Sequence, residues 1–497
     1  MLAGSALPFL SYTGAERLSH VQKFQYKAII PRNPAQAKAK VPDGFRVAFG
    51  QDYFSLNAND EGTVFDCADL PAASGAIAFL RLQVAIDTRQ EDEVEVYLDG
   101  SDRKIGQLSI WYPTGLQIFE TPLDCDITSL KNEGIRLKLL GGSDTTYYFS
   151  SGAENGSHLL IVESGGNSAS VNEEWKNLLC SDWSLQPFGW TEGCTLDGLQ
   201  QLYARKKDPQ ALQAIRRHLD LYWPDEKNLV YADLWARPRD NTFTNLEAGL
   251  PFATLAHHRP SHASVKLFLD FCKERFDAGM RFKPDGLSTE GCYTLAYPLT
   301  TLGTALKAPE LYEMALLELE QRIKYLTDDG AVYNIGSISK GKTRIRRNWG
   351  RGYVWFLLGI VRCGEILQSE SPLKNDPGVK RLKEVYRHYA QIAMSFKQPD
   401  HSWKAYLDQP GTRFESSATA GLAAAFAHGH RIGWLPEFSQ KDLLAVYNRL
   451  LKSTTADGFL TDVTQHNAGS INLLQRGSYR VIAQYAIGFL GHIKAHL

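Results

Sequence analysis

The order of apolar and polar residues follows two different patterns in the two parts of the chain. From about residue 45 to residue 165, apolar and polar residues alternate with a period of two, as in residues 93–98 (EVEVYL). Such alternation is typical of half-buried β-strands, and turn signals such as Gly141-Gly142 interrupt it at short intervals. Short strands spaced in this way predict an antiparallel β-sandwich. The strands are expected near residues 93–98, 104–112, 116–124, 135–140, 145–150 and 158–163.

The pattern becomes helical after residues 165–170 (GGNSAS), which have the composition of a linker. Leu196, Leu199, Leu202 and Tyr203, for example, fall on one face of a helix. The periodicity predicts twelve helical segments, near residues 173–181, 192–205, 209–223, 243–256, 262–276, 288–305, 309–326, 350–368, 376–397, 415–432, 438–453 and 478–496.

These segments pair into six hairpins. In most pairs the first helix is apolar and rich in small residues, as in residues 418–427, while the second carries charges on one face, as in residues 310–326. Inner helices buried on all sides and half-exposed outer helices would show this difference. The sequence therefore predicts a multidomain α and β protein, with a β-sandwich over residues 1–165 and an (α/α)6 barrel over residues 171–497. An open solenoid is the alternative, and it would not gather the inner-helix starts around one site.

Composition narrows the class of protein. The 497 residues carry a net charge of -1, so nothing global points to nucleic acid or to an anionic membrane. No apolar run is long enough to span a bilayer. Aromatic residues make up 11% of the chain, which suits carbohydrate binding as well as a large core. Met1 to Leu10 is apolar but lacks the positively charged residues with which a secretory signal begins. This segment could be the remainder of a trimmed signal, so a periplasmic or secreted location is favoured, and a cytoplasmic location stays open.

The sequence signals neither a metal nor an organic cofactor. The seven cysteines show no C-x-x-C spacing, and there is no HExxH motif, Walker-type loop or G-x-S-x-G elbow. Catalysis would then rest on side chains alone. The oligomeric state cannot be inferred.

The strongest chemical signal is residues 348–355 (NWGRGYVW), which open an apolar helix behind a run of cations. The flat indole ring of Trp349 could stack on a sugar, and the planar guanidinium group of Arg351 could bind a carboxylate through two parallel hydrogen bonds. A solvated basic loop before a core helix is the plain alternative. If the ring is correct, the residues that begin inner helices share one mouth; these are Trp190, Glu192, Asp240, Asn241, Asn245, Glu247, Glu290, Tyr293, Trp349, Arg351, Arg413 and Glu415.

Several carboxylates in one mouth suit glycoside chemistry. One carboxylic acid donates a proton, and often a second carboxylate activates water or attacks. We take Glu290 as the first candidate for the acid, with Glu192, Asp240 or Glu247 as its partner. Acids at helix starts are also common as caps or dipole partners, which is the alternative for each of them.

From about Glu173 onward the chain resembles the unsaturated rhamnogalacturonyl and glucuronyl hydrolases, which are (α/α)6-barrel enzymes. The resemblance rests on Trp349-Gly350-Arg351-Gly352 with Trp355, and on Ser402-Trp403 followed by residues 408–410 and 415–420. It implies that Trp349 stacks on a uronic acid and that Arg351 holds its carboxylate. It also implies that an acid protonates the C4=C5 double bond and that water adds at C5, after which the hemiketal falls apart. Trp190, Tyr293, Asn334, Trp403 and Glu415 are further candidates for substrate binding.

The chain departs from the family at three positions. The family's catalytic Asp is absent from residues 287–293, where Glu290 is the nearest acid. Thr244 and Asn245 stand at about the place of its second Asp, and Asn334 follows Tyr333 where the family has a His. These departures leave the choice between unsaturated and saturated uronides open. The predicted function is a glycoside hydrolase that removes a terminal uronic acid from polysaccharide-derived oligosaccharides. The alternatives are a lyase of uronic-acid glycans and a glycan-binding barrel without activity, and neither the linkage nor the role of the sandwich can be inferred.

Overall fold

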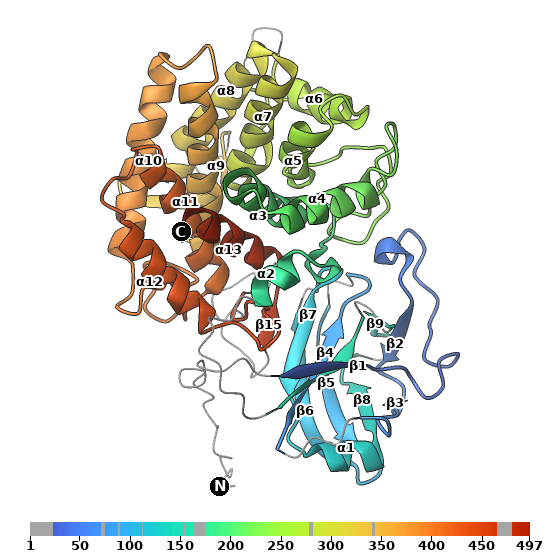
Figure 1. Cartoon of the computed structure of the whole chain (residues 1–497). Helices are drawn as coiled ribbons and strands as arrows, with labels where there is room; N and C mark the ends of the chain where they lie inside the picture. Colours follow the sequence, from blue (N-terminus) through green and yellow to red (C-terminus); the bar gives the residue numbers. More distant parts are fainter. Residues whose placement is uncertain are drawn as a thin grey trace.

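The structure is a computed structural model of the whole chain. It describes residues 23–70, 75–87, 90–111, 113–142, 144–152, 156–163, 174–277, 282–339, 343–464 and 480–497. A strand-rich part and a helical part lie against each other, and the first leads into the second along the chain (Figure 1). The predicted linker at residues 165–170 and the apolar start lie outside the described residues.

The strand-rich part contains each of the six predicted strands. Its antiparallel sheets have the orders β1-β10-β4-β7-β15 and β3-β8-β5-β6, with β2 paired to β9. Val94, Val96 and Leu98 of β5 are buried while the residues between them are less so, which is the expected alternation. The elements are β1 (Phe24–Ala28), β2 (Tyr53–Asn57), β3 (Thr63–Phe65), β4 (Ile77–Gln83), β5 (Glu91–Leu98), β6 (Arg103–Trp111), β7 (Ile118–Pro122), α1 (Ile127–Glu133), β8 (Ile135–Leu139), β9 (Thr146–Ser150) and β10 (His158–Val162).

Six helices of the second part form a closed ring, because each packs on the next and the last packs on the first. They are α3 (Trp190–Lys206), α5 (Pro251–His258), α7 (Tyr297–Leu306), α9 (Gly350–Ser369), α11 (Ser416–Arg431) and α13 (Tyr485–His496). Outside them lie α2 (Glu174–Leu179), α4 (Pro209–Tyr222), α6 (Ser264–Glu274), α8 (Pro309–Leu326), α10 (Pro377–Ser395) and α12 (Gln440–Leu451). This arrangement is an (α/α)6 barrel.

Small residues allow the inner helices to pack closely. A Cβ at Gly198 of α3 would lie 2.1 Å from the carbonyl oxygen of Gly488 in α13, so only glycine fits there. Residues 418–427 of α11 are buried on every face, as the alanine-rich pattern predicted. Outer helices such as α10 bury one side only.

Three of the predicted helix starts are wrong. Residue 288 ends a short strand, β11 (Gly286–Ser288), and a π-helical turn at Cys292–Ala296 precedes α7. Residues 243–250 contain only a 3-10 turn, Leu246–Ala248, because Pro251 begins the regular helix of α5. Residues 480–482 form a strand, β15 (Arg480–Ile482), before α13.

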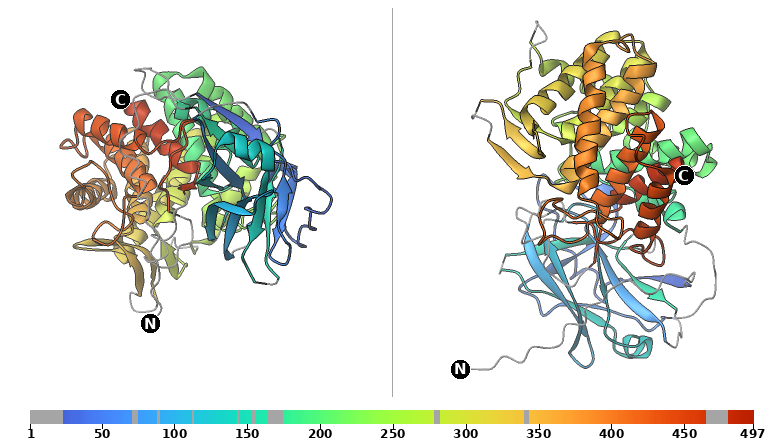
Figure 2. Two further views of the ribbon diagram at one scale, coloured as in Figure 1. Left: turned by 90° about the horizontal axis from the view of Figure 1, so that it is seen from below. Right: turned by 90° about the vertical axis from the view of Figure 1, so that its left-hand side faces the viewer.

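A small sheet interrupts the barrel between α8 and α9. It contains β12 (Thr327–Asp328), β13 (Ala331–Ser337) and β14 (Arg344–Arg347), and β13 also pairs with β11. The β13–β14 hairpin projects from the side of the barrel (Figure 2, right). The cationic stretch before Trp349 is therefore partly a strand and not a loop.

The strand-rich part lies against the end of the barrel where inner helices begin (Figures 1 and 2). β15, just before α13, pairs with β7, and Gln484 donates to the carbonyl of Leu116 at 2.8 Å. Arg81 of β4 makes a fully buried ion pair with Asp457, 2.6 Å away. None of the described helices is long and apolar enough to cross a membrane.

Candidate active site

Glu290 lies at the mouth of the ring, just before the π-helical turn that leads into α7. Its side chain is half-buried, and its Oε1 accepts a hydrogen bond from Nδ2 of Asn334 at 3.3 Å. Asn334 is held in turn by the hydroxyl of Thr289, 2.5 Å from its Oδ1. The other oxygen of Glu290, Oε2, is buried and has no hydrogen-bond partner among the described residues. A buried oxygen without a partner is costly, so a ligand or water is expected to occupy this position.

Arg351, in the first turn of α9, lies close enough to Glu290 for their charges to interact. Its Nη1 donates to the hydroxyl of Tyr485 at 2.8 Å and to the carbonyl of Thr464 at 3.2 Å. Burial alone would lower the pKa of Arg351, but Tyr485, Glu415 and Glu290 outweigh it and raise that pKa. Arg351 is therefore a fixed, buried cation close to two carboxylates.

Glu415 is the N-cap of α11. Its carboxylate accepts hydrogen bonds from the backbone N–H of Ala418, from the hydroxyl of Ser417 at 2.7 Å and from the backbone N–H of Thr464 at 3.0 Å. These donors occupy both of its oxygens, so Glu415 is already engaged as a helix cap. Glu415 thus lies at the mouth, where its contacts are those of a cap.

Aromatic rings form one wall of the mouth. Trp190 lies 5.1 Å from Trp355 and 4.8 Å from Tyr485, measured between ring centroids. Trp349 is only 8% exposed, and the guanidinium carbons of Arg351 and Arg346 lie 4.8 and 5.6 Å from its ring centroid. Because two cations already contact this indole, little of its face is left for a sugar. Stacking on Trp349 stays a prediction.

The proposed partners of Glu290 lie in different surroundings. Asp240 makes a bidentate ion pair with Arg46 of the strand-rich part, at 2.7 and 2.8 Å. Glu192 is fully buried and is held by His218 at 2.7 Å and by the backbone N–H of Gln186 at 3.0 Å. Glu247 is half-buried and lines a narrow cleft beside Trp235. A catalytic role for any of the three remains a prediction.

Two further candidates lie deeper in the barrel. The hydroxyl of Tyr293 donates to Asp197, which also pairs with Arg362 at 2.9 Å. Trp403 is fully buried, and its indole N–H donates to the carbonyl of Ala393 at 2.7 Å. The polar atoms of both rings have partners inside the protein, so neither is directed to a ligand in this structure.

Arg346 is a site residue that the sequence analysis did not single out. In the β13–β14 ladder, Tyr333 pairs with Arg347 and Ile335 with Ile345, so Arg346 stands opposite Asn334. Its neighbours Arg344 and Arg347 pair with Asp328 and Asp408, whereas no acidic side chain among the described residues pairs with Arg346. The run of cations was a signal, but the pairing register that selects Arg346 was not visible in the sequence.

The mouth thus combines one carboxyl that has a buried oxygen without a partner among the described residues with a fixed cation and a second cation beside an indole. It could bind an anionic sugar and transfer a proton to it. Among the described residues, no group of three or more His, Cys, Asp or Glu side chains could hold a metal ion.

Comparisons with known proteins agree with the barrel fold. The family model described as Glycosyl Hydrolase Family 88 matches residues 167–490. No curated protein sequence matches the chain. A Klebsiella pneumoniae protein described as a possible member of family GH105 has a TM-score of 0.52 at 17% identity, covering 63% of this chain and 83% of its own.

Two more solved structures have similar folds. A glycoside hydrolase of family 105 from C. acetobutylicum has a TM-score of 0.51 at 18% identity, covering 65% of this chain and 96% of its own. A protein described as a polysaccharide lyase has a TM-score of 0.50 at 17% identity, covering 66% of this chain and 94% of its own. At such identities the likeness shows the fold alone, which is shared by hydrolases and a lyase.

Proposed function

Because the chain belongs to glycosyl hydrolase family 88, we propose that it removes a terminal 4,5-unsaturated uronic acid from oligosaccharides produced by polysaccharide breakdown. The enzyme is a glycoside hydrolase, and the proposal concerns its substrate and mechanism. The observation that carries it is the buried, unpartnered Oε2 of Glu290 at a mouth that also contains Arg351. The carboxylate of an unsaturated uronic acid would pair with Arg351, and the double bond of the same sugar would accept a proton from Glu290.

In the proposed mechanism Arg351 binds the carboxylate of the sugar, and Arg346 adds a second positive charge. Glu290 delivers its proton to C4 of the double bond and then takes a proton from the water that adds at C5. The product is a hemiketal at C5. It opens to a ketone at C5 and leaves a hemiacetal at C1, whose collapse to an aldehyde releases the rest of the oligosaccharide as an alcohol. Asn334 keeps Glu290 in place through Oε1, so that Oε2 faces the reacting atoms.

The number of available carboxyls favours the unsaturated substrate over a saturated one. A glycosidase acting on a saturated uronide needs two carboxyl groups that flank the bond. Of the other candidates, Glu415 is engaged as a cap, Glu192 by His218 and Asp240 by Arg46, while Glu247 lies in the neighbouring cleft beside Trp235. Hydration of a double bond needs one carboxyl that gives and then takes a proton, and Glu290 can serve as that group.

We further propose that the predicted organisation holds, with a β-sandwich domain over residues 1–165 and a catalytic barrel over residues 171–497. Two main cores support it, since most buried apolar residues of the strand-rich part cluster apart from those of the barrel. The sandwich would brace the mouth of the barrel, because β15 extends one of its sheets.

The test compares two substrates and follows the absorbance of the conjugated double bond. An unsaturated uronyl disaccharide should lose this absorbance, whereas a chromogenic β-glucuronide should release no chromophore. Release of chromophore alone would contradict the proposal in favour of a saturated substrate. A rise in absorbance on an intact uronic-acid polymer would identify a lyase, because elimination creates the double bond that hydration removes.

A further inference from the structure

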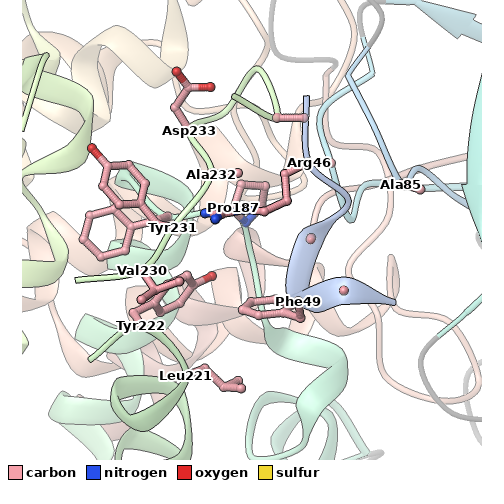
Figure 3. Close-up of a pocket in the computed structure, with 15 residues that line it drawn as sticks. Arg46, Phe49, Ala85, Pro187, Leu221, Tyr222, Val230, Tyr231, Ala232 and Asp233 are labelled. Carbon is pink, nitrogen blue, oxygen red and sulfur yellow. The ribbon is translucent and has the colours of Figure 1, made fainter. Parts of the chain in front are cut away.

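A cavity of about 310 Å³ lies between the strand-rich part and the barrel, away from Glu290 and Arg351. One side is the segment around Phe49, and the other side is formed by the end of α4 and the loop that follows it (Figure 3). Its volume is at the lower end of the range for small-ligand sites. The strand-rich part therefore contributes to a pocket as well as to the support of the barrel.

Large apolar side chains are exposed around this cavity. Phe49 is 39% exposed, Leu221 41% and Val230 38%. Trp235, in the adjoining loop, is 40% exposed. Exposed apolar residues gathered at one pocket indicate a binding surface, whereas scattered ones would need no explanation.

The tyrosines in the wall are almost fully buried, and their hydroxyls have partners inside the protein. The hydroxyl of Tyr222 donates to the carbonyl of Gln186, and that of Tyr231 donates to the carbonyl of Thr242 at 3.1 Å. The Phe49 ring lies 5.5 Å from that of Tyr222. Among the aromatic residues that line the cavity, a ligand would meet mainly the exposed ring of Phe49, and the C–H faces of sugar rings are well suited to such a ring.

The backbone at Phe49 is strained. Its φ is +54°, a left-handed value that is rare and unfavourable for a bulky residue. The contacts of Arg46 hold this segment against the barrel, because its backbone N–H donates to the carbonyl of Ala236 at 2.8 Å and its side chain pairs with Asp240. The structure thus keeps an aromatic ring exposed over the cavity in an unfavourable conformation.

The cavity adjoins a narrow cleft that reaches the start of α3, where a Cβ at Gly189 would lie 3.2 Å from the carbonyl oxygen of Glu247. Phe188, Tyr231 and Asp233 line the cavity and also line this cleft, which contains Trp235 and Glu247. Phe188 lies two residues before Trp190, which forms a wall of the mouth. A chain of sugars whose terminal ring lies at Glu290 could therefore continue past Trp235 into the cavity.

From these observations the geometry points to a binding site for the leaving part of the oligosaccharide in the cavity at Phe49. The inference rests on the proposed function, since it supposes that the terminal sugar occupies the mouth. Its ligand class is a neutral or weakly polar sugar ring that stacks on Phe49, one or more residues from the bond that is cleaved. The strand-rich part would then determine a preference for longer substrates.

The test measures kcat/KM for an unsaturated disaccharide and for a longer oligosaccharide with the same terminal sugar. The kcat/KM of the wild-type protein should be roughly tenfold higher for the longer substrate, which corresponds to about 1.4 kcal/mol of additional binding free energy. Phe49→Gly should remove this preference. Glycine accepts a positive φ, so the variant is expected to fold at least as stably as the wild type.

Two variants serve as controls. Phe49→Tyr keeps the ring and should keep the preference, and Leu444→Ala removes an exposed apolar side chain of α12, outside the cavity. Equal rates on both substrates in the wild type, or an unchanged preference in Phe49→Gly, would overturn the inference. Inactivity of the wild type on the disaccharide and on the longer substrate would instead reject the proposed function. A change in oligomeric state in Phe49→Gly would show that the surface binds protein, and this too would overturn the inference.

Discussion

At the scale of single residues, the surroundings of each carboxylate separate candidates that look alike in sequence. Glu415 is surrounded by backbone and hydroxyl donors, Glu192 is buried against His218, and Asp240 is bound to Arg46. Glu290 alone among these four has a buried oxygen without a partner in the described part of the chain. The difference lies in contacts made across long sequence distances, such as that between Arg46 and Asp240.

Removal of the charge of Arg346 should weaken substrate binding. We expect Arg346→Gln to raise KM for the unsaturated disaccharide by roughly tenfold, with a smaller change in kcat, because a charge-assisted contact contributes about 1.5–3 kcal/mol. The measurement is steady-state kinetics at low and at high salt. The KM of the wild type should rise with salt more than that of the variant.

Arg347→Gln is the matched control for this prediction. It removes the same charge from the neighbouring position, but Arg347 is paired with Asp408. If both variants change KM equally, the effect comes from the general charge of β14, and a specific contact of Arg346 with the substrate is excluded.

At the scale of secondary structure, much of the barrel could be predicted from its sequence. Helices such as α8 and α10 are amphipathic and have Pro near their first turn, so their period and their starts are both visible. The β13–β14 hairpin was missed because its cations resemble a solvated loop. β15 was assigned to a helix because its partner, β7, lies more than 300 residues earlier in the chain.

The candidate site was predictable to a similar extent. Trp349 and Arg351 stand in one motif, and the ring placed their helix start at the same mouth as Glu290. The contacts of Trp349 with two guanidinium groups could not be foreseen, since they depend on the register of β14 and on an inward turn of each side chain. A motif in the sequence specifies residue types, whereas the surface left free for a ligand depends on tertiary packing.

The buried ion pair between β4 and the barrel should contribute strongly to stability. Arg81→Met would leave Asp457 and Glu120 buried without their cation, and the loss of one partner of such a pair costs about 3–5 kcal/mol. Urea unfolding followed by circular dichroism measures this cost. The double variant Arg81→Met with Asp457→Leu should recover part of the loss, and a destabilisation below about 1 kcal/mol in the single variant would contradict the account.

At the scale of the whole molecule, buried titratable groups make stability depend on pH. Burial lowers the pKa of His158 and His257 to about 4 and that of His428 to about 3. Burial alone would raise the pKa of Asp197 and Asp457, but Arg362 and Arg81 respectively outweigh it and hold both well below their usual range. All these pKa values are lower in the folded state than in the unfolded state, so their contribution is present at neutral pH and is lost as pH falls.

We therefore expect the urea midpoint to be constant above about pH 6.5, to fall below it as the unfolded histidines bind protons, and to continue to fall below about pH 4 as the unfolded aspartates bind protons. The measurement is a series of urea unfolding curves across this range. A midpoint that does not change down to pH 4 would contradict the lowered pKa values, because it would show that the histidines bind protons as readily in the folded state as in the unfolded state.

The central claim is that Glu290 transfers the proton in the hydration of an unsaturated uronic acid. The most direct measurement compares wild-type protein and Glu290→Gln on the unsaturated uronyl disaccharide, by following the loss of its conjugated absorbance. The account predicts a fall in kcat of roughly 10²–10⁴-fold with an unchanged melting temperature, because proton transfer is lost while the fold is kept. Activity of Glu290→Gln within about tenfold of the wild type would contradict it, since general acid catalysis contributes more than that.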